Sequence, residues 1–237
     1  MKKILCALLV FAMSICLFAC EPPADKEDIF TKSEGVMTWE QFNAAEMETE
    51  VTIEAYVQGK QSWWADKARF YLQDGVGGYF VYDMACSEEE YDKLAVGTKV
   101  RISGVKTAWS DEVEIVDATF EILEGHYVAD PVDVTAKLGT DEIVNYQNMK
   151  VSFSHLTFVK AEYVNGEPGP DNDIYVTVGY NGETYEFCVE SYLTGPGTTA
   201  YDIFATLEPG AHINVEGFLY WYWGVNTHIT NVTAHTH

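Results

Sequence analysis

The sequence predicts an all-β protein made of two tandem five-stranded barrels, each with one short helix. Three observations support this fold class. Apolar and polar residues alternate through several short runs, as they do in half-buried strands. A glycine-to-glycine spacing with matching apolar positions at residues 97–104 returns at residues 210–217. A repeat separated by about a hundred residues indicates a duplicated domain rather than a solenoid, whose repeats are shorter.

The start of the chain has the pattern of a secretory signal. Two lysines precede an apolar run that is too short to span a bilayer comfortably, and small residues follow it. Leu17–Cys20 resembles the lipobox of bacterial lipoproteins, in which the cysteine becomes the lipidated first residue. We therefore predict a lipoprotein signal peptide over residues 1–19 and a tether over residues 20–35. The resemblance implies an extracytoplasmic protein anchored to a bacterial membrane through Cys20.

The first predicted barrel covers residues 36–125. Thr38 and Gln41 form a capping box that predicts a short helix, and Ser87 and Glu90 form a second one. The glycine-rich turn after Asp74 predicts a hairpin between two strand-like runs. The predicted strands of this half lie at residues 51–57, 70–73, 79–82, 97–104 and 113–122.

The second predicted barrel covers residues 126–237 and repeats the same order. Asn181-Gly182 is a strong hairpin signal between two of its strands. A helix-like segment at residues 199–207 precedes the strand at residues 210–217. The other predicted strands lie at residues 151–158, 174–178, 185–189 and 226–232. Residues 130–148 would join the two copies and include a short helix.

Five short strands with a helix before the fourth is the order of an OB-fold, a small Greek-key barrel. Three segments, Val51–Val57, Phe70–Gly75 and Gly97–Gly104, resemble the OB modules of the tRNA anticodon-binding-like type. Such modules occur in exported bacterial lipoproteins and in secreted nuclease-associated proteins. The resemblance covers residues 50–122 and, more weakly, residues 148–233. It implies the fold first, because the shared motifs are turn glycines and alternating apolar residues.

The charge is strongly acidic and unevenly distributed. The net charge is −23, and it becomes −25 once the two lysines of the signal are removed. After Lys160 the chain has ten carboxylates and neither lysine nor arginine. Lysine and arginine contacts with phosphates supply most of the non-specific affinity for nucleic acids. The composition therefore argues against nucleic acid as a partner.

No cofactor, metal ion or catalytic activity is predicted. Cys86 and Cys188 are the only thiols that would remain in the mature chain, and both a disulfide and two buried free thiols stay open. The acidic turn Asp171–Asp173 does not fit an EF-hand loop, and His235 and His237 lie in a tail. Motifs such as His-Glu-x-x-His, Gly-x-Ser-x-Gly and the phosphate-binding loop are absent from the sequence.

Aromatic residues form the candidate ligand site. An OB-fold binds oligonucleotides and oligosaccharides on the face of its second and third strands, framed by the loops that join strands 1–2 and 4–5. The aromatic residues that map to these loops in the two copies are Trp63, Trp64, Trp109, Tyr220, Trp221, Tyr222 and Trp223. They could stack on a ligand, or they could close the barrels and pack the two domains together.

The sequence favours a membrane-anchored, non-enzymatic binding module whose ligand is a glycan or a peptide held by these aromatic loops. Two alternatives stay open. One is a structural or assembly scaffold, in which the aromatic residues form a protein interface. The other is a nucleic-acid-binding accessory protein, which the OB resemblance implies.

Overall fold

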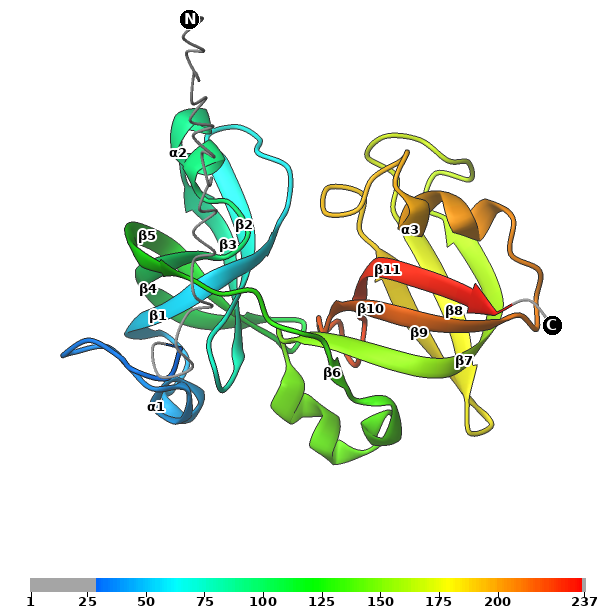
Figure 1. Ribbon diagram of the computed structural model, residues 1–237, viewed down its shortest axis with the longest axis horizontal. Helices are drawn as coiled ribbons and strands as arrows, with labels where there is room; N and C mark the ends of the chain where they lie inside the picture. The colour runs from blue at the N-terminus through cyan, green and yellow to red at the C-terminus, as the bar shows by residue number, and fades with distance from the viewer. Residues whose placement is uncertain (1–28, 236–237) are drawn as a thin grey trace, which may run out of the picture.

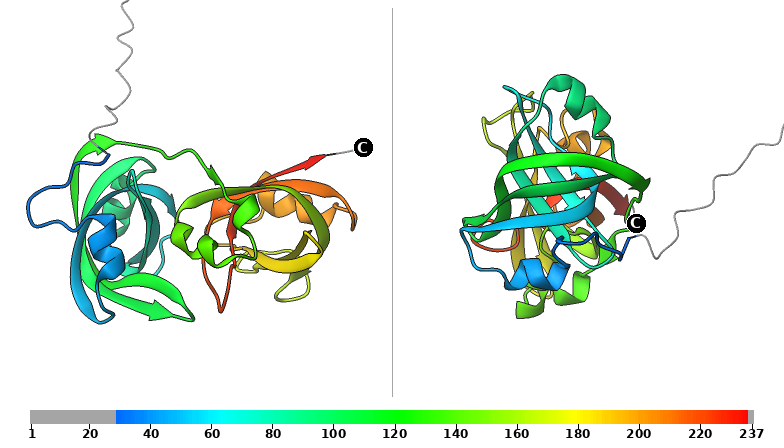
Figure 2. Two further views of the ribbon diagram at one scale, coloured as in Figure 1. Left: turned by 90° about the horizontal axis from the view of Figure 1, so that it is seen from below. Right: turned by 90° about the vertical axis from the view of Figure 1, so that its left-hand side faces the viewer.

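The computed structural model describes residues 29–235, so the predicted signal peptide, Cys20 and most of the predicted tether lie outside the described residues. The all-β fold class is confirmed, with two barrels that lie side by side and a short segment that joins them (Figures 1 and 2). Within this part of the chain no helix is both long and apolar enough to cross a lipid bilayer.

The first barrel is closed by pairing of its first and fourth strands. The order around it is β1-β2-β3-β5-β4, and all neighbours are antiparallel except β3 and β5. Both predicted capping boxes are present, at Thr38 and at Ser87. The elements are α1 (Trp39–Ala44), β1 (Thr49–Lys60), β2 (Lys67–Gln73), β3 (Gly78–Ala85), α2 (Glu88–Lys93), β4 (Thr98–Trp109) and β5 (Glu112–His126).

The second barrel has the same strand order. Its strands run β7-β8-β9-β11-β10, β10 pairs with β7 to close the circuit, and β9 and β11 are the parallel pair. Asn181 and Gly182 take positive φ values in the predicted hairpin. The elements are β7 (Lys150–Tyr163), β8 (Ile174–Tyr180), β9 (Glu183–Val189), α3 (Thr199–Asp202), η3 (Ile203–Ala205), β10 (His212–Phe218) and β11 (His228–His235). Equal strand order and equal helix position make both barrels OB-like.

The segment between the barrels carries the short strand β6 (Val132–Asp133), which pairs with β7. The helix expected in this region is present as two 3-10 helices, η1 (Thr135–Lys137) and η2 (Asp141–Tyr146). Each barrel has its own apolar core. Cys86 and Cys188 are buried free thiols, and only Cys86 belongs to a core.

The described end of the predicted tether contacts the first barrel. Ile29 is buried, and its carbonyl accepts a hydrogen bond from the Gly75 amide. The Lys32 ammonium lies 2.6 Å from a carboxylate oxygen of Asp74, which is also buried. These contacts fix the point at which the chain enters the first barrel.

Candidate functional site

The outer face of the β2–β3 hairpin points toward the second barrel. Side chains alternate across a strand, so the apolar residues Phe70 and Leu72 of β2 face the first core, whereas Tyr71 between them faces outward. On β3, Phe80 and Tyr82 face outward in the same way. In an OB-fold this is the face that binds ligands.

Part of this face is covered by the second barrel. The Tyr71 ring lies flat on the Phe218 ring, with centroids 4.3 Å apart and planes 2° apart. The Phe80 and Tyr220 rings meet edge to face at 5.5 Å. The Tyr71 hydroxyl lies 2.7 Å from Nδ1 of His228, whose pKa is lowered to about 3 by burial, so the imidazole is neutral. These contacts fix one barrel on the other.

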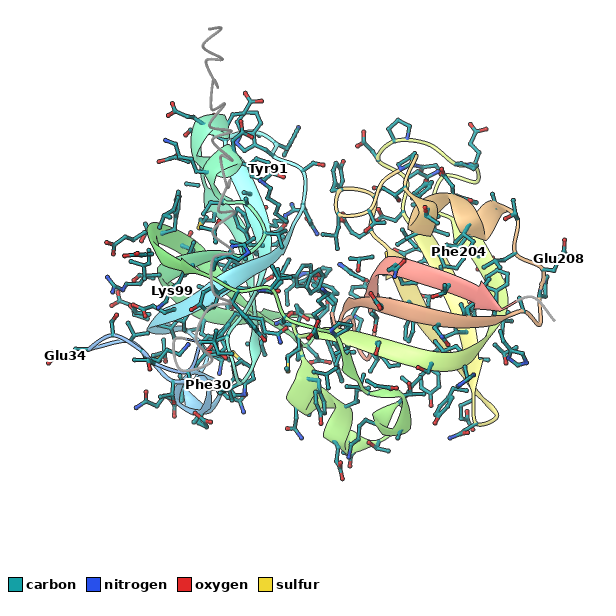
Figure 3. All side chains as sticks on the ribbon, viewed as in Figure 1. Phe30, Glu34, Tyr91, Lys99, Phe204 and Glu208 are labelled. Carbon is teal, nitrogen blue, oxygen red and sulfur yellow. The ribbon has the colours of Figure 1, made fainter. Side chains whose placement is uncertain are left out.

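Beyond these contacts the face opens into a cavity of about 410 Å³ between the barrels. The opposite wall includes Tyr175 of β8 and Cys188 of β9, which are the second and third strands of the second barrel. The equivalent faces of the two barrels therefore look toward each other, and side chains crowd the region where they meet (Figure 3). The lining is mainly aromatic and acidic: Gln61, Arg69, Phe80, Tyr82, Trp109, Glu114, Asp173, Tyr175, Cys188, Glu190, Tyr220, Tyr222, Asn226 and His228.

A smaller cavity of about 160 Å³ adjoins the first, and the two share Gln61 and Arg69 in their walls. Trp64 of the β1–β2 loop lines the smaller cavity and is 72% exposed. Trp109, at the end of β4, lines the larger one and is 54% exposed. We call the two cavities together the inter-barrel groove. It runs across β2 and β3 between the two loops that frame an OB-fold ligand site.

Both barrels frame the Trp109 end of the inter-barrel groove. The rings of Trp109 and Tyr222 are in contact, with centroids 5.4 Å apart. The backbone amide of Trp223 donates a hydrogen bond to the Ser110 carbonyl, with the nitrogen and oxygen 2.9 Å apart. The β4–β5 and β10–β11 loops are thereby held together, and this end of the groove exists only while the barrels are docked.

The seven aromatic residues predicted from the sequence have different positions. Trp63 is half-buried and donates from Nε1 to the Cys86 carbonyl at 2.8 Å. Trp221 packs against the second core, and its backbone amide donates to a Glu112 carboxyl oxygen at 2.7 Å. Trp223 is 72% exposed and lines neither cavity. The other four line the inter-barrel groove: Trp64, Trp109, Tyr220 and Tyr222.

Several groove residues were missed by sequence reasoning. Arg69 and Tyr82 follow from the alternation on the β2–β3 hairpin, which also places them on the outer face. Tyr175, Glu114 and Glu190 gave no comparable signal, because their importance depends on how the second barrel docks. The structure thus adds polar groups to a site that the sequence described only by its aromatic rings.

Arg69 is the cationic residue shared by the two cavities. Its Nε donates to a carboxylate oxygen of Asp83 at 2.7 Å, and the guanidinium lies over the Tyr82 ring, 4.5 Å from its centroid. Nη1 donates to the side-chain oxygen of Gln61 at 3.2 Å. Lys67 also lines the smaller cavity, with its ammonium 3.1 Å from Asp83. The groove thus has two cations, and both are near one carboxylate.

Two buried carboxyl groups also line the groove. Glu114 is 7% exposed and makes no side-chain hydrogen bond within residues 29–235, and burial raises its pKa to about 7. Glu190 accepts from the Leu193 amide at 2.8 Å, and burial, aided by the nearby Asp173, raises its pKa to about 7. In the described part of the chain these and other potential ligand side chains do not gather into a group able to hold a metal ion.

Glu112 lies two residues before Glu114 on the same face of β5, but it is sealed at the interface of the barrels and fully buried. One carboxyl oxygen accepts from the Trp221 amide and from Nε2 of Gln147, the latter at 3.2 Å. The other oxygen has no partner within residues 29–235. Burial raises the pKa of Glu112 to about 8, so the carboxyl group is mainly protonated at neutral pH.

No protein-family model matches the chain, and no curated protein matches it. Solved structures give distant matches. A murine DNA-binding protein bound to double-stranded DNA is 13% identical, with a TM-score of 0.36 over 77% of this chain and 94% of that one. A replication protein A heterotrimer bound to single-stranded DNA is 12% identical, with a TM-score of 0.35 over 85% and 52%. The aspartyl-tRNA synthetase of Entamoeba histolytica is 12% identical, with a TM-score of 0.31 over 62% and 51%. At these identities the likeness concerns the fold alone.

Two predictions from the sequence are wrong, namely the glycan or peptide ligand and the exclusion of nucleic acid as a partner. The solved structures that the chain resembles include proteins bound to double-stranded and single-stranded DNA. The exclusion used the charge of the whole C-terminal half, which does not describe the groove. The groove lies on β2 and β3 of the first barrel, where Lys67 and Arg69 are. The glycan hypothesis treated the aromatic loops as one surface, whereas Trp63 and Trp221 have structural contacts.

Proposed function

We propose that this protein binds short segments of single-stranded nucleic acid in the inter-barrel groove. The observation that carries the proposal is the position of this groove, across the β2–β3 face of an OB-like barrel, with Trp64 at one end and Trp109 and Tyr222 at the other. Aromatic rings along such a face are stacking platforms for unpaired bases. Bases of a duplex are already stacked and paired, so a groove of aromatic side chains favours a single strand.

The charge of the groove sets how the strand is held. Lys67 and Arg69 allow at most two phosphate contacts. Each phosphate would compete with the Asp83 carboxylate, which already pairs with both cations. Affinity would therefore come mainly from the bases. We expect the plot of log affinity against log salt to have a slope no steeper than about −1.4, since each phosphate contact with a single strand contributes about −0.7. The proposed role is binding and includes no catalytic step.

Trp109→Ala should weaken binding of a labelled single strand of about 12 nucleotides by about fivefold to about 150-fold, because a base–aromatic stack contributes about 1–3 kcal/mol. Fluorescence anisotropy at low salt measures this affinity. Trp223→Ala is the matched control, because Trp223 is also an exposed indole but lies outside both cavities. Absence of binding by the wild-type chain, or equal losses in the two variants, would contradict the proposal.

We also propose that the chain is exported and lipid-anchored through Cys20, as its first twenty residues predict. Expression in a bacterial host fed radiolabelled palmitate should label the wild-type protein and place it in the membrane fraction. Cys20→Ala should remove the label and abolish membrane recovery. Labelling that survives the substitution would exclude Cys20 as the lipidated residue.

A further inference from the structure

The Glu114 carboxyl group faces the larger cavity of the inter-barrel groove and makes no side-chain hydrogen bond within residues 29–235. Glu114 lies on β5, next to Phe80 of β3 in the parallel pairing. The residue as a whole is 7% exposed, because neighbouring strands and the second barrel cover most of it. The Glu114 oxygens are not among the fully buried side-chain atoms without a partner in the described residues, so they open into the cavity, where a ligand can reach them.

The groups around Glu114 define which kind of ligand its carboxyl group could bind. Burial and the Asp83 carboxylate raise the pKa of Glu114, whereas Arg69, which lines the same cavity, favours its charged form. Tyr82, Trp109 and Tyr222 supply flat rings in the same cavity. A ligand that fits this set offers a flat aromatic body, hydrogen-bond donors for a carboxylate, and an acceptor for a guanidinium.

We propose that Glu114 makes the groove selective for guanine among the bases of a bound single strand. This inference rests on the proposed function and specifies which base the groove prefers. The Watson–Crick edge of guanine presents N1–H and an amino group at C2 side by side, which match the two oxygens of one carboxylate. Its O6 is an acceptor, and arginine is a common donor to that atom.

The other bases fit the same acceptor less well. Thymine offers one ring N–H between two carbonyl oxygens, and those oxygens would face the Glu114 carboxylate. Cytosine and adenine each offer one amino group beside a ring nitrogen acceptor. Each of these bases leaves one carboxylate oxygen unsatisfied or opposed, and a correct two-point contact discriminates between bases by about 1–3 kcal/mol.

The test uses thymidine strands of about 12 nucleotides that carry a single central guanine, hypoxanthine, adenine, cytosine or thymine. The single-guanine strand should bind about tenfold more tightly than the all-thymine strand, since one two-point contact is gained. Hypoxanthine keeps N1–H and O6 but lacks the amino group, so its strand should lie between them. Anisotropy titrations at one fixed salt concentration give the ratios.

Glu114→Gln should abolish the difference in affinity between the single-guanine and all-thymine strands, because the amide replaces one acceptor by a donor: it loses the two-point contact with guanine and no longer opposes the thymine oxygens. Glu124→Gln is the matched control on the same strand β5, where the side chain is exposed. Circular dichroism and thermal melting establish that both variants are folded.

Each outcome of this test supports or overturns either the guanine preference or the proposed function. A guanine preference that is lost in Glu114→Gln and kept in Glu124→Gln supports the assignment. Equal binding of all five strands by the wild-type protein, or a guanine preference that persists in Glu114→Gln, overturns it and leaves the proposed function standing. Failure of every strand to bind overturns the proposed function itself.

Discussion

Replacing Gly78 by alanine should push the two barrels apart while leaving each barrel folded. A Cβ atom at Gly78 would overlap the backbone carbonyl of Asn148 and the backbone amide of Met149 at the start of the second barrel. These backbone atoms cannot move easily, because the Asn148 amide donates to the Leu219 carbonyl at 2.8 Å and the Leu219 amide donates to the Met149 carbonyl at 3.0 Å.

The loss of docking free energy should be large, because separating the barrels exposes aromatic rings that only the interface covers. Tyr71, Phe80 and Phe218 form a buried cluster between the barrels, separate from both cores. Burial of a large apolar side chain stabilises by about 1.5–3 kcal/mol, so losing three of them removes several kcal/mol of docking free energy. The larger cavity has walls from both barrels, and it would open at the same time.

Small-angle scattering should show a larger radius of gyration for Gly78→Ala, and strand binding should fall by at least tenfold, which corresponds to about 1.4 kcal/mol. The circular dichroism spectrum should stay that of a β protein, because each barrel has its own core. Gly169→Ala is the matched control, since its Cβ would meet no atom within 4 Å. An unchanged radius together with unchanged affinity would mean that docking does not depend on close approach at Gly78.

The second large effect concerns pH. The free energy of unfolding should fall by roughly 2 kcal/mol, through Glu112 alone, as the pH rises from about 6.5 to about 8. Burial at the interface raises the pKa of Glu112 to about 8 from an ordinary value of 4.5. Between these values the folded chain keeps a proton that the unfolded chain has released, so raising the pH favours unfolding. Glu114 and Glu190, each with a pKa raised to about 7, act in the same direction.

The free energy of unfolding is compared from about pH 6.5 upward, because below that value His228 changes it in the opposite direction. Its pKa is lowered to about 3 from 6.5, so the unfolded chain binds the extra proton in this lower range and stability rises with pH there. Above that value the imidazole of the unfolded chain also becomes neutral, so the contribution of His228 fades. The raised carboxyl groups are then the main source of the pH dependence up to about pH 8.

Glu112→Gln imitates the protonated carboxyl and should flatten this dependence. Its oxygen can still accept from the Trp221 amide, as the Glu112 carboxyl does now. Urea unfolding at about pH 6.5 and about pH 8 measures the difference for the wild type, for Glu112→Gln and for the exposed control Glu124→Gln. Stability that falls equally in all three proteins would assign the dependence to other groups.

Local sequence signals predicted the fold well. The capping boxes at Thr38 and Ser87 and the hairpin at Asn181-Gly182 depend on residues three or fewer positions apart, and the structure contains all of them. The equal order of elements in the two halves predicted two barrels of one topology, which the strand pairings confirm. These features are determined by contacts within one element or between neighbouring elements.

The candidate site was less accessible to sequence reasoning, because it depends on contacts between the halves. Trp63 and Trp64 are adjacent, yet a hydrogen bond to the Cys86 carbonyl turns Trp63 inward and leaves Trp64 exposed. Glu112 and Glu114 share one face of β5. The second barrel covers Glu112 completely but leaves Glu114 in the cavity. Neither difference is visible in composition or spacing.

The face-to-face placement of the two barrels has a consequence for stoichiometry. Tandem OB-folds that present their ligand faces side by side can extend a site by adding modules along one strand. Here Tyr82 of the first barrel and Tyr175 of the second line the same cavity. The two barrels therefore share a single space instead of lengthening a track. Each molecule should saturate with one ligand segment, whose length does not grow with the number of barrels.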